Sequence, residues 1–206
     1  MAVVDETLVD LGLDEQPPAP LAAVARPGTV VTVGSLSKSV WGGLRVGWLR
    51  AEADDVRRLA AAAGHSQLSG PVLEQLAACY LLDAEADVLA ARRATLRTAR
   101  DALVAALGRT LPDWEVRSPA GGLVLWCRLP GRWSSALVTA AEPAGLTLAA
   151  GPRFGTGHAF EDRLRLPYTQ PVAVLERAVG LLAEVVPDLR PDRPRRLSAA
   201  SDDVVV

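Results

Sequence analysis

The segment GSLSKSVWGGLRVGW, residues 34–48, contains Lys38, which is the only lysine in the chain. The other 21 of the 22 basic residues are arginines, a composition typical of a coding bias that replaces lysine wherever only charge matters. Arginine stays protonated in proteins, whereas a lysine amine can lose its proton and act as a nucleophile. The retained lysine therefore favours amine chemistry at this position, with chance placement as the alternative.

Groups that suit a phosphate flank this lysine in the sequence. Ser35 and Ser37 precede it, and Arg45 follows it. The β-branched run TVVTVG at 29–34 predicts a buried parallel strand that ends at these residues, and ligands bind at the carboxyl ends of such strands. Arginine offers a fork of donors and serine a neutral donor. An amine beside a phosphate site is the arrangement that forms a Schiff base with pyridoxal phosphate.

Four segments carry a resemblance to a known family. SLSK followed by GLRVGW resembles the lysine segment of the fold-type I PLP-dependent enzymes, the class I/II aminotransferases, and is most similar to the aminotransferase-like domain of MocR-type regulators. VVDETL resembles the family's strand-end aspartate segment, and SPAGGLVLWCRLP and GPRFGTGHAFEDRLRLPYT resemble its small domain. The resemblance covers roughly residues 2–186. The order of the four segments is more specific than the lysine motif alone.

The resemblance implies pyridoxal 5′-phosphate as the cofactor and gives roles to five residues. Lys38 is expected to be the catalytic residue, which binds the cofactor as a Schiff base and then moves the Cα proton of the substrate. Ser35 and Arg45 are expected to hold the cofactor phosphate, with Ser37 as an assisting group. Asp5 is expected to face the pyridine nitrogen and keep it protonated, so that the ring withdraws electrons.

The resemblance also implies that the substrate binds through an arginine. Arg165, in RLRLPYT, is expected to bind the α-carboxylate as a bidentate pair. An ion pair with Glu161 or Asp162 is the alternative for this side chain. Arg163 is the next candidate for the same role, but we expect it on the opposite side of the strand. At Leu8 the sequence departs from many relatives, which carry a tyrosine that bonds the phenolic oxygen of the cofactor.

The predicted fold class is α/β, of the PLP-dependent transferase type. Residues 1–108 are expected to form the C-terminal part of the large domain, with a mainly parallel sheet and the long connecting helix. Residues 109–187 are expected to form a small α+β domain, and 188–206 a disordered tail. The family's glycine-rich phosphate turn and its stacking aromatic precede the aspartate strand, with which this chain opens. We therefore expect an N-terminally truncated chain that is not a competent transaminase by itself.

Composition and charge narrow the possible partners. The net charge of −2 gives no electrostatic case for nucleic acid or an anionic membrane. The chain shows no signal peptide and no apolar stretch of membrane-spanning length, which favours a cytoplasmic location. Cys79 and Cys127 lie in apolar contexts and are expected to be buried thiols. His65 and His158 have no ligand partners at useful spacing, so no metal site is expected.

Three further patterns give expectations about burial. The helical segment PVLEQLAACYLLD, residues 71–83, is apolar on most sides and is expected to be buried. The arginines of the long helix that follows are expected to form a solvated face. Trp114, Trp126 and Trp133 are expected in the core, whereas Trp41 is expected to line either the site or a subunit interface.

Two functions are consistent with these residues. The first is amino-group transfer between an amino acid and a 2-oxo acid, with a homodimer expected for an intact relative. The second is the effector-sensing, PLP-binding half of a MocR/GntR-type transcriptional regulator, in which cofactor chemistry controls DNA binding by another segment. A truncated product without activity is a third possibility.

Overall fold

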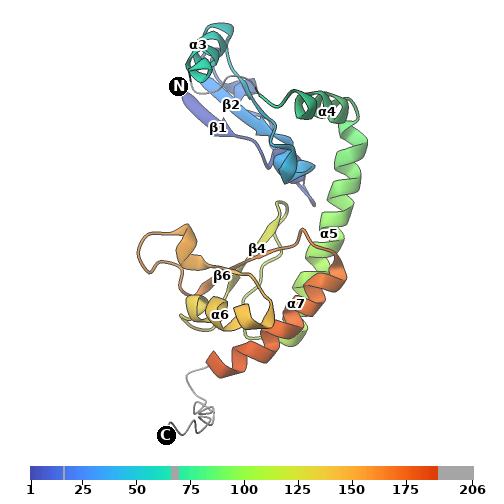
Figure 1. Ribbon diagram of the computed structural model, residues 1–206, viewed down its shortest axis with the longest axis vertical. Helices are drawn as coiled ribbons and strands as arrows, with labels where there is room; N and C mark the ends of the chain where they lie inside the picture. Colours follow the sequence, from blue (N-terminus) through green and yellow to red (C-terminus); the bar gives the residue numbers. More distant parts are fainter. Residues whose placement is uncertain (16, 66–69, 190–206) are drawn as a thin grey trace, which may run out of the picture. The chain divides into compact units, whose positions relative to one another are not determined.

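The computed structural model describes residues 1–15, 17–65 and 70–189, and these form two compact units (Figure 1). The first unit comprises Met1–Thr98 with Pro119–Leu123, and the second comprises Ala99–Ser118 with the chain from Val124 onward. The long helix α5, Glu85–Thr110, contributes residues to both units.

The predicted boundary at residue 108 stays a prediction. Of the predicted tail, Asp188 and Leu189 belong to the 3-10 helix Val186–Leu189. The rest of the predicted tail, 190–206, lies outside the described residues.

The first unit contains a three-stranded sheet in the order β1-β2-β3, formed by Ala2–Asp5, Val30–Ser35 and Gly47–Arg50. Strands β1 and β2 are parallel, and β2 and β3 are antiparallel. The predicted buried strand corresponds to β2, in which Val31, Thr32 and Gly34 are buried. The helices of this unit, apart from α5, are α1 (Leu21–Val24), α2 (Leu36–Ser39), α3 (Ala53–Gly64), α4 (Val72–Asp83) and the 3-10 helices Val9–Leu11 and Gly42–Leu44.

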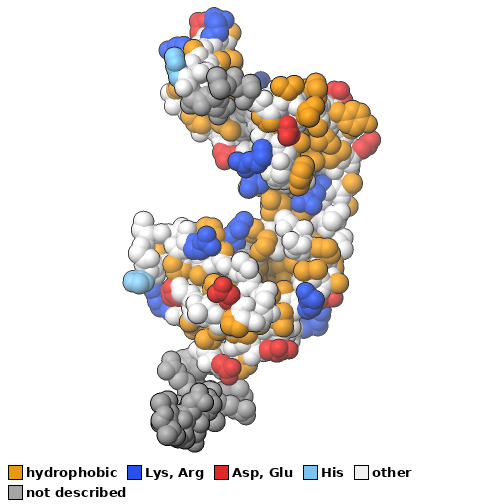
Figure 2. All heavy atoms as spheres, in the orientation of Figure 1, with side chains coloured by type: hydrophobic (Ala, Val, Ile, Leu, Met, Phe, Trp, Pro, Cys, Tyr) orange, Lys and Arg blue, Asp and Glu red, His pale blue; other side chains and the backbone are white. Residues whose placement is uncertain are grey.

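Helix α4 differs from its prediction. Ala78 is the only buried residue among the described residues of α4, and Leu73 and Tyr80 are 78% and 76% exposed. Figure 2 shows apolar side chains gathered on the surface over this helix. The expectation that Cys79 is buried was therefore wrong, and that for Cys127 is confirmed. An apolar sequence shows that a helix can be buried, but burial also requires a surface to cover it.

The second unit contains a three-stranded antiparallel sheet in the order β4-β6-β5, formed by Val124–Arg128, Arg163–Pro167 and Ala149–Ala150. Leu125, Cys127, Leu164 and Leu166 alternate with more accessible residues on β4 and β6, so that one face of the sheet is buried. The helices of this unit, apart from α5, are α6 (Ser134–Ala141), α7 (Val172–Val185) and the 3-10 helices Glu142–Ala144, Gly151–Phe154 and Val186–Leu189.

The core of the second unit is formed by this buried sheet face together with apolar residues of the helices. Leu137 of α6 and Leu175, Val179 and Leu182 of α7 are buried. The core thus combines an amphipathic sheet with amphipathic helices, as a small α+β unit requires.

The other face of this sheet carries Trp126, Arg163 and Arg165. The expectation that Arg163 and Arg165 lie on opposite sides was wrong, because residues two apart in a strand share a face. Trp126 lies opposite Arg165 in the register of β4 and β6 and is 37% exposed, so its prediction as a core residue was also wrong.

Arginines of α5 bind the backbone of the first unit. Arg93 donates from Nε to the carbonyl oxygen of Asp10 at 2.7 Å, and Arg97 donates to the carbonyl oxygen of Leu13. The expectation of a solvated arginine face was therefore wrong for Arg93, which is half-buried, and for Arg100, which is buried, whereas Arg97 keeps 46% of its side chain exposed. Among the described residues, no helix is both long enough and apolar enough to span a membrane.

Candidate functional site

Lys38 lies in a short helical turn directly after β2. Helix α2 has four residues, and Ser35 caps its N-terminus by accepting a hydrogen bond from the backbone N–H of Ser37 at 3.1 Å. The Ser35 hydroxyl donates in turn to the carbonyl oxygen of Val46 at 2.8 Å, which ties the turn to the segment before β3. Leu36 is buried in a small cluster with Leu44, so the apolar side of the turn is anchored and Lys38 is exposed.

Arg45 lies at a strained backbone position beside this turn. Its φ of 53° is in the left-handed region, which few residues other than glycine adopt. Among the described residues, it shares this property only with Phe160 as a non-glycine residue. Gly34 has a separate constraint, because a Cβ atom there would overlap the ring of Trp48. The backbone around the turn is thus held in a specific conformation, which is a common property of functional sites.

Asp5 lies at the carboxyl end of β1, the strand parallel to β2. Its Oδ1 accepts a hydrogen bond from the backbone N–H of Thr7 at 2.9 Å. This backbone hydrogen bond is the largest cause that lowers the pKa of Asp5 below 3.8. A smaller lowering comes from a hydrogen bond with the Thr7 side chain, and a further one from the positive charge of Lys38. The carboxyl group is therefore ionised at neutral pH.

The structure brings several predicted site residues together in the first unit. Asp5 ends β1, Ser35 ends β2, and Ser37 and Lys38 follow in α2, so these four lie at the same edge of the parallel strand pair. Arg45 joins them through the segment that Ser35 binds. This edge of the sheet thus carries an amine, a carboxylate, two hydroxyls and a guanidinium. Groups of these kinds can donate to and accept from a phosphorylated aromatic aldehyde.

Arg165 belongs to the second unit, on β6. Its guanidinium carbon lies 5.7 Å from the centre of the Phe154 ring. Among the described residues, no carboxylate forms an ion pair with it. The alternative of an ion pair with Glu161 or Asp162 is not observed, since Glu161 accepts hydrogen bonds from the backbone and hydroxyl of Ser135.

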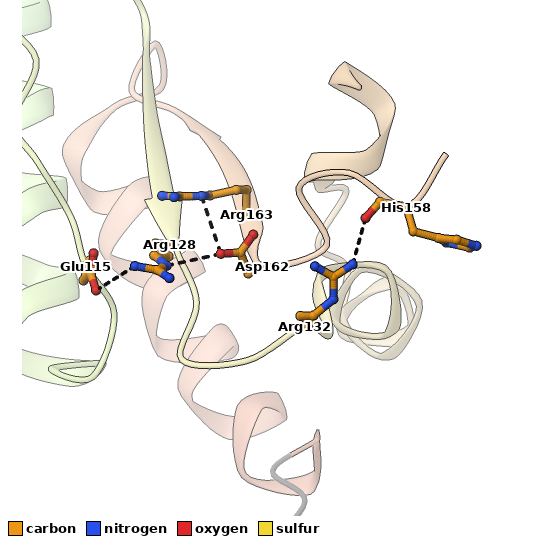
Figure 3. A network of polar contacts seen from close by, with 6 residues as sticks. All are labelled: Glu115, Arg128, Arg132, His158, Asp162 and Arg163. Carbon is orange, nitrogen blue, oxygen red and sulfur yellow. Dashed lines mark hydrogen bonds and ion pairs between the residues drawn. The ribbon is translucent and has the colours of Figure 1, made fainter. Parts of the chain in front are cut away.

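Arg163, on the same face, has acidic neighbours (Figure 3). Asp162 accepts a hydrogen bond from Arg128 at 3.2 Å and lies 3.8 Å from the Nε of Arg163. Arg128 also pairs with Glu115 at 3.4 Å. Arg163 is thus engaged in an ion-pair network, whereas Arg165 has an aromatic neighbour and no acidic partner in the described chain. This contrast favours Arg165 over Arg163 as the group that meets an external carboxylate.

Comparison with known proteins identifies the family. The family model described as aminotransferase class I and II matches residues 1–182. The chain belongs to the class I and II aminotransferases. The prediction of this family, of its α/β fold and of its cofactor, pyridoxal 5′-phosphate, is confirmed.

Relatives of this aminotransferase chain include both enzymes and regulators. It is 32% identical over 146 residues to the 2-aminoadipate transaminase of Thermus thermophilus, covering 69% of this chain and 36% of the relative. It is 35% identical over 130 residues to YisV, an uncharacterised HTH-type transcriptional regulator of Bacillus subtilis, covering 60% and 26%.

A solved structure of the family extends the match over most of the chain. The α-aminoadipate aminotransferase LysN from Thermus thermophilus, in complex with N-(5′-phosphopyridoxyl)-L-leucine, superposes with a TM-score of 0.82 at 27% identity. The match covers 91% of this chain and 50% of that one. The chain therefore spans half or less of the length of these relatives.

Sequence reasoning missed residues that position the candidate site groups of this aminotransferase chain. The hydrogen bonds of Thr7 to Asp5 have no distinctive sequence signal. Phe154, which lies under Arg165, was within a segment quoted for its resemblance, GPRFGTGHAFEDRLRLPYT, but no role followed from the pattern. Its position between glycines was the available signal, because glycines permit close packing of a loop.

Proposed function

We propose that this chain supplies the lysine-bearing part of a PLP-dependent aminotransferase, which transfers an amino group between an amino acid and a 2-oxo acid. The observation that carries the proposal is the position of Lys38, the sole lysine, at the sheet edge where Asp5, Ser35 and Arg45 also lie. When bound, pyridoxal phosphate supplies the electron-withdrawing ring that makes the substrate Cα proton acidic.

The residues at this edge fit the chemical groups of the cofactor. Lys38 would hold the cofactor through its amine and would carry the proton to and from the substrate Cα. Asp5, with its lowered pKa, stays ionised and would hold a protonated ring nitrogen. Ser35 and Arg45 would hold the phosphate, with Ser37 as an assisting group. The hydroxyl of Ser35 now donates to the carbonyl of Val46, so a phosphate oxygen must replace that carbonyl as its acceptor.

Arg165 is proposed to bind the α-carboxylate of the substrate. The planar guanidinium matches a carboxylate in a bidentate pair, and no acidic side chain of the described residues competes for it. We further propose that the protein acts as a homodimer, as the resemblance implies for an intact relative, and that it is located in the cytoplasm, as the sequence favours.

Binding of the cofactor by Lys38 tests this proposal. Addition of pyridoxal phosphate to the chain, followed by removal of free cofactor, is expected to leave bound cofactor detectable by absorbance. Lys38→Arg keeps the positive charge but removes the reactive amine, so the bound species should disappear. Arg57→Ala, in the exposed part of α3, is the matched control and should retain it. Retention of the same species by Lys38→Arg would contradict the proposal.

A second candidate function is supported by the regulator relatives. Two HTH-type transcriptional regulators of Bacillus subtilis match this chain, YisV at 35% identity and YdfD at 28%. In this alternative, cofactor chemistry at Lys38 would control DNA binding by a separate segment. The gene sequence preceding Met1 tests it directly, since a winged-helix coding segment in the same reading frame would favour the regulator.

A further inference from the structure

We propose that Trp126, Phe154 and Phe160 form an aromatic bracket that positions Arg165 and gives its subsite a preference for carboxylates with an apolar substituent. The inference rests on the proposed carboxylate-binding role of Arg165. It adds which residues hold this arginine and which class of carboxylate the subsite favours. All four residues belong to the second unit.

The bracket is a set of three aromatic rings in which Trp126 makes an edge contact with each of the two phenylalanines. The centre of the Trp126 ring lies 5.6 Å from that of Phe154, with an angle of 87° between the ring planes. It lies 5.7 Å from the centre of the Phe160 ring, with an angle of 79°. Edge-to-face pairs at these distances are attractive and fix the relative orientation of the rings. Trp126 thus supports both phenylalanines from β4, a strand of the central sheet of this unit.

Arg165 is held by the face of one ring of this bracket. Its guanidinium lies over Phe154, and its backbone pairs with Trp126 across β4 and β6. A cation over an aromatic ring is attracted without losing its hydrogen-bond donors, which remain available for an oxyanion. An acidic partner would instead offset the charge of the guanidinium, as Asp162 does at 3.8 Å from the Nε of Arg163. The aromatic contact can therefore position the guanidinium and leave its charge unneutralised.

Close packing within the 151–160 loop surrounds Phe160. A Cβ atom at Gly151 would overlap the carbonyl oxygen of Phe160, and one at Gly155 would lie 2.8 Å from the Phe160 ring. Phe160 itself has a φ of 61°, and its carbonyl oxygen accepts a hydrogen bond from the backbone N–H of Arg163 at 2.8 Å. This loop is thus packed against the start of β6 around Phe160.

The accessible surface of the bracket determines which carboxylates it favours. Trp126, Phe154 and Phe160 are 37%, 48% and 44% exposed, so apolar ring surface lies beside the guanidinium. A carboxylate that binds Arg165 places its substituent against this surface. An apolar substituent gains binding free energy because it leaves water for this ring surface. A carboxylate without such a substituent gains only the free energy of the ion pair.

Two carboxylate probes of the full chain test this inference. 3-Phenylpropionate and acetate are titrated separately, and binding is followed by NMR at the indole N–H of Trp126 and the Nε–H of Arg165. 3-Phenylpropionate is expected to bind about tenfold more tightly than acetate. Phe154→Leu should weaken 3-phenylpropionate binding by about two- to fivefold, in line with one exposed cation–π contact. Phe154→Tyr should restore it.

The NMR spectrum also separates positioning from a general loss of structure. Phe154→Leu should remove the ring-current shift of the Arg165 side-chain protons while far-UV circular dichroism stays unchanged. Arg163→Lys is the matched control on the same strand face and should leave both affinities within twofold, because Arg163 belongs to the Asp162 network.

Each contrary outcome identifies what is wrong. If Arg165→Lys leaves both affinities unchanged, or if the wild type binds neither probe, the carboxylate role of Arg165 fails and the bracket with it. If Arg165→Lys weakens both probes but Phe154→Leu weakens neither, the carboxylate role stands and the bracket is overturned. Equal affinity of the wild type for both probes would overturn the preference for apolar carboxylates.

Discussion

The two units of the chain differ in how far their sheets and helices are covered. In the second unit, Leu125, Leu137 and Leu164 have no exposed surface. In the first unit, all four residues of β3 are exposed, and none of the twelve described residues of α3 is buried. The candidate cofactor residues thus lie in the unit with less coverage, and the candidate substrate arginine lies in the unit with a closed core. Because buried apolar surface is the main source of stability, we expect the first unit to be the less stable of the two.

The two cysteines give the largest expected difference between the units. Cys79, on α4, is exposed, whereas Cys127, on β4, is buried, and burial raises the pKa of Cys127 to about 12. Since the thiolate is the reactive form, iodoacetamide at pH 8 should alkylate Cys79 at least about a thousandfold faster than Cys127. Peptide mass mapping over time measures both rates. Comparable rates would show that Cys127 is as accessible as Cys79 and would contradict the closed core of the second unit.

The same leucine truncation in each sheet gives the next largest effect. Leu164→Ala, at a fully buried site of β6, should lower the free energy of unfolding by about 3 kcal/mol. Leu49→Ala, at a site of β3 that is 41% exposed, should lower it by less than about 1 kcal/mol. Urea denaturation of the two variants tests the difference. A cost at Leu49 as large as that at Leu164 would mean that β3 is covered in solution.

An arginine of α5 is expected to stabilise the first unit moderately. Arg93→Ala removes the hydrogen bond to the carbonyl oxygen of Asp10 and should cost about 1 kcal/mol of stability. Arg57→Ala is the control, because its partner Asp54 is exposed on α3 and such surface pairs contribute little. Hydrogen exchange of the amides in residues 8–14 reports the local effect. Unchanged exchange rates in Arg93→Ala would contradict this contribution and would agree with the solvated arginine face that the sequence predicted.

The carboxyl group of Asp5 gives the smallest expected effect, a shift in titration. Its hydrogen bonds to Thr7 and the charge of Lys38 depress its pKa in the folded state. Any stability that Asp5 contributes is therefore present above pH 3.8 and is lost as the pH falls through its folded-state pKa. A carboxyl 13C titration should give a midpoint below 3.8 in the wild type and a higher one in Thr7→Ala. A wild-type midpoint above 3.8 would contradict the hydrogen bonds that Asp5 accepts from Thr7.

The elements and residues nearest the strand ends were predictable from the sequence. β-Branched runs identify β2, and the residues that follow a parallel strand must lie at its carboxyl edge, so Lys38 and Ser35 were placed correctly along the chain. Asp5 follows the same rule at the end of β1. The local pattern, an amine beside a phosphate site, already suggested pyridoxal phosphate, and the family resemblance added the expected role of each residue.

Properties that depend on a partner surface were not predictable. The apolar sequence of α4 could not show that its residues stay exposed, and Trp126 could not be distinguished from a core tryptophan. Arg93 finds its acceptor 83 residues away, at Asp10, which no local pattern reveals. The positions of Arg163 and Arg165, in contrast, were predictable. The side chains of a strand alternate between its faces, so residues two apart share one face.

The central claim is that Lys38 is the cofactor-binding lysine of this aminotransferase chain, and chemical trapping tests it most directly. The chain is incubated with pyridoxal phosphate, reduced with borohydride, digested and mapped by mass spectrometry. Because no other lysine exists, the account predicts a pyridoxyl adduct on the peptide that contains Lys38. An adduct confined to the amino group of Met1, with the Lys38 peptide unmodified, would contradict it.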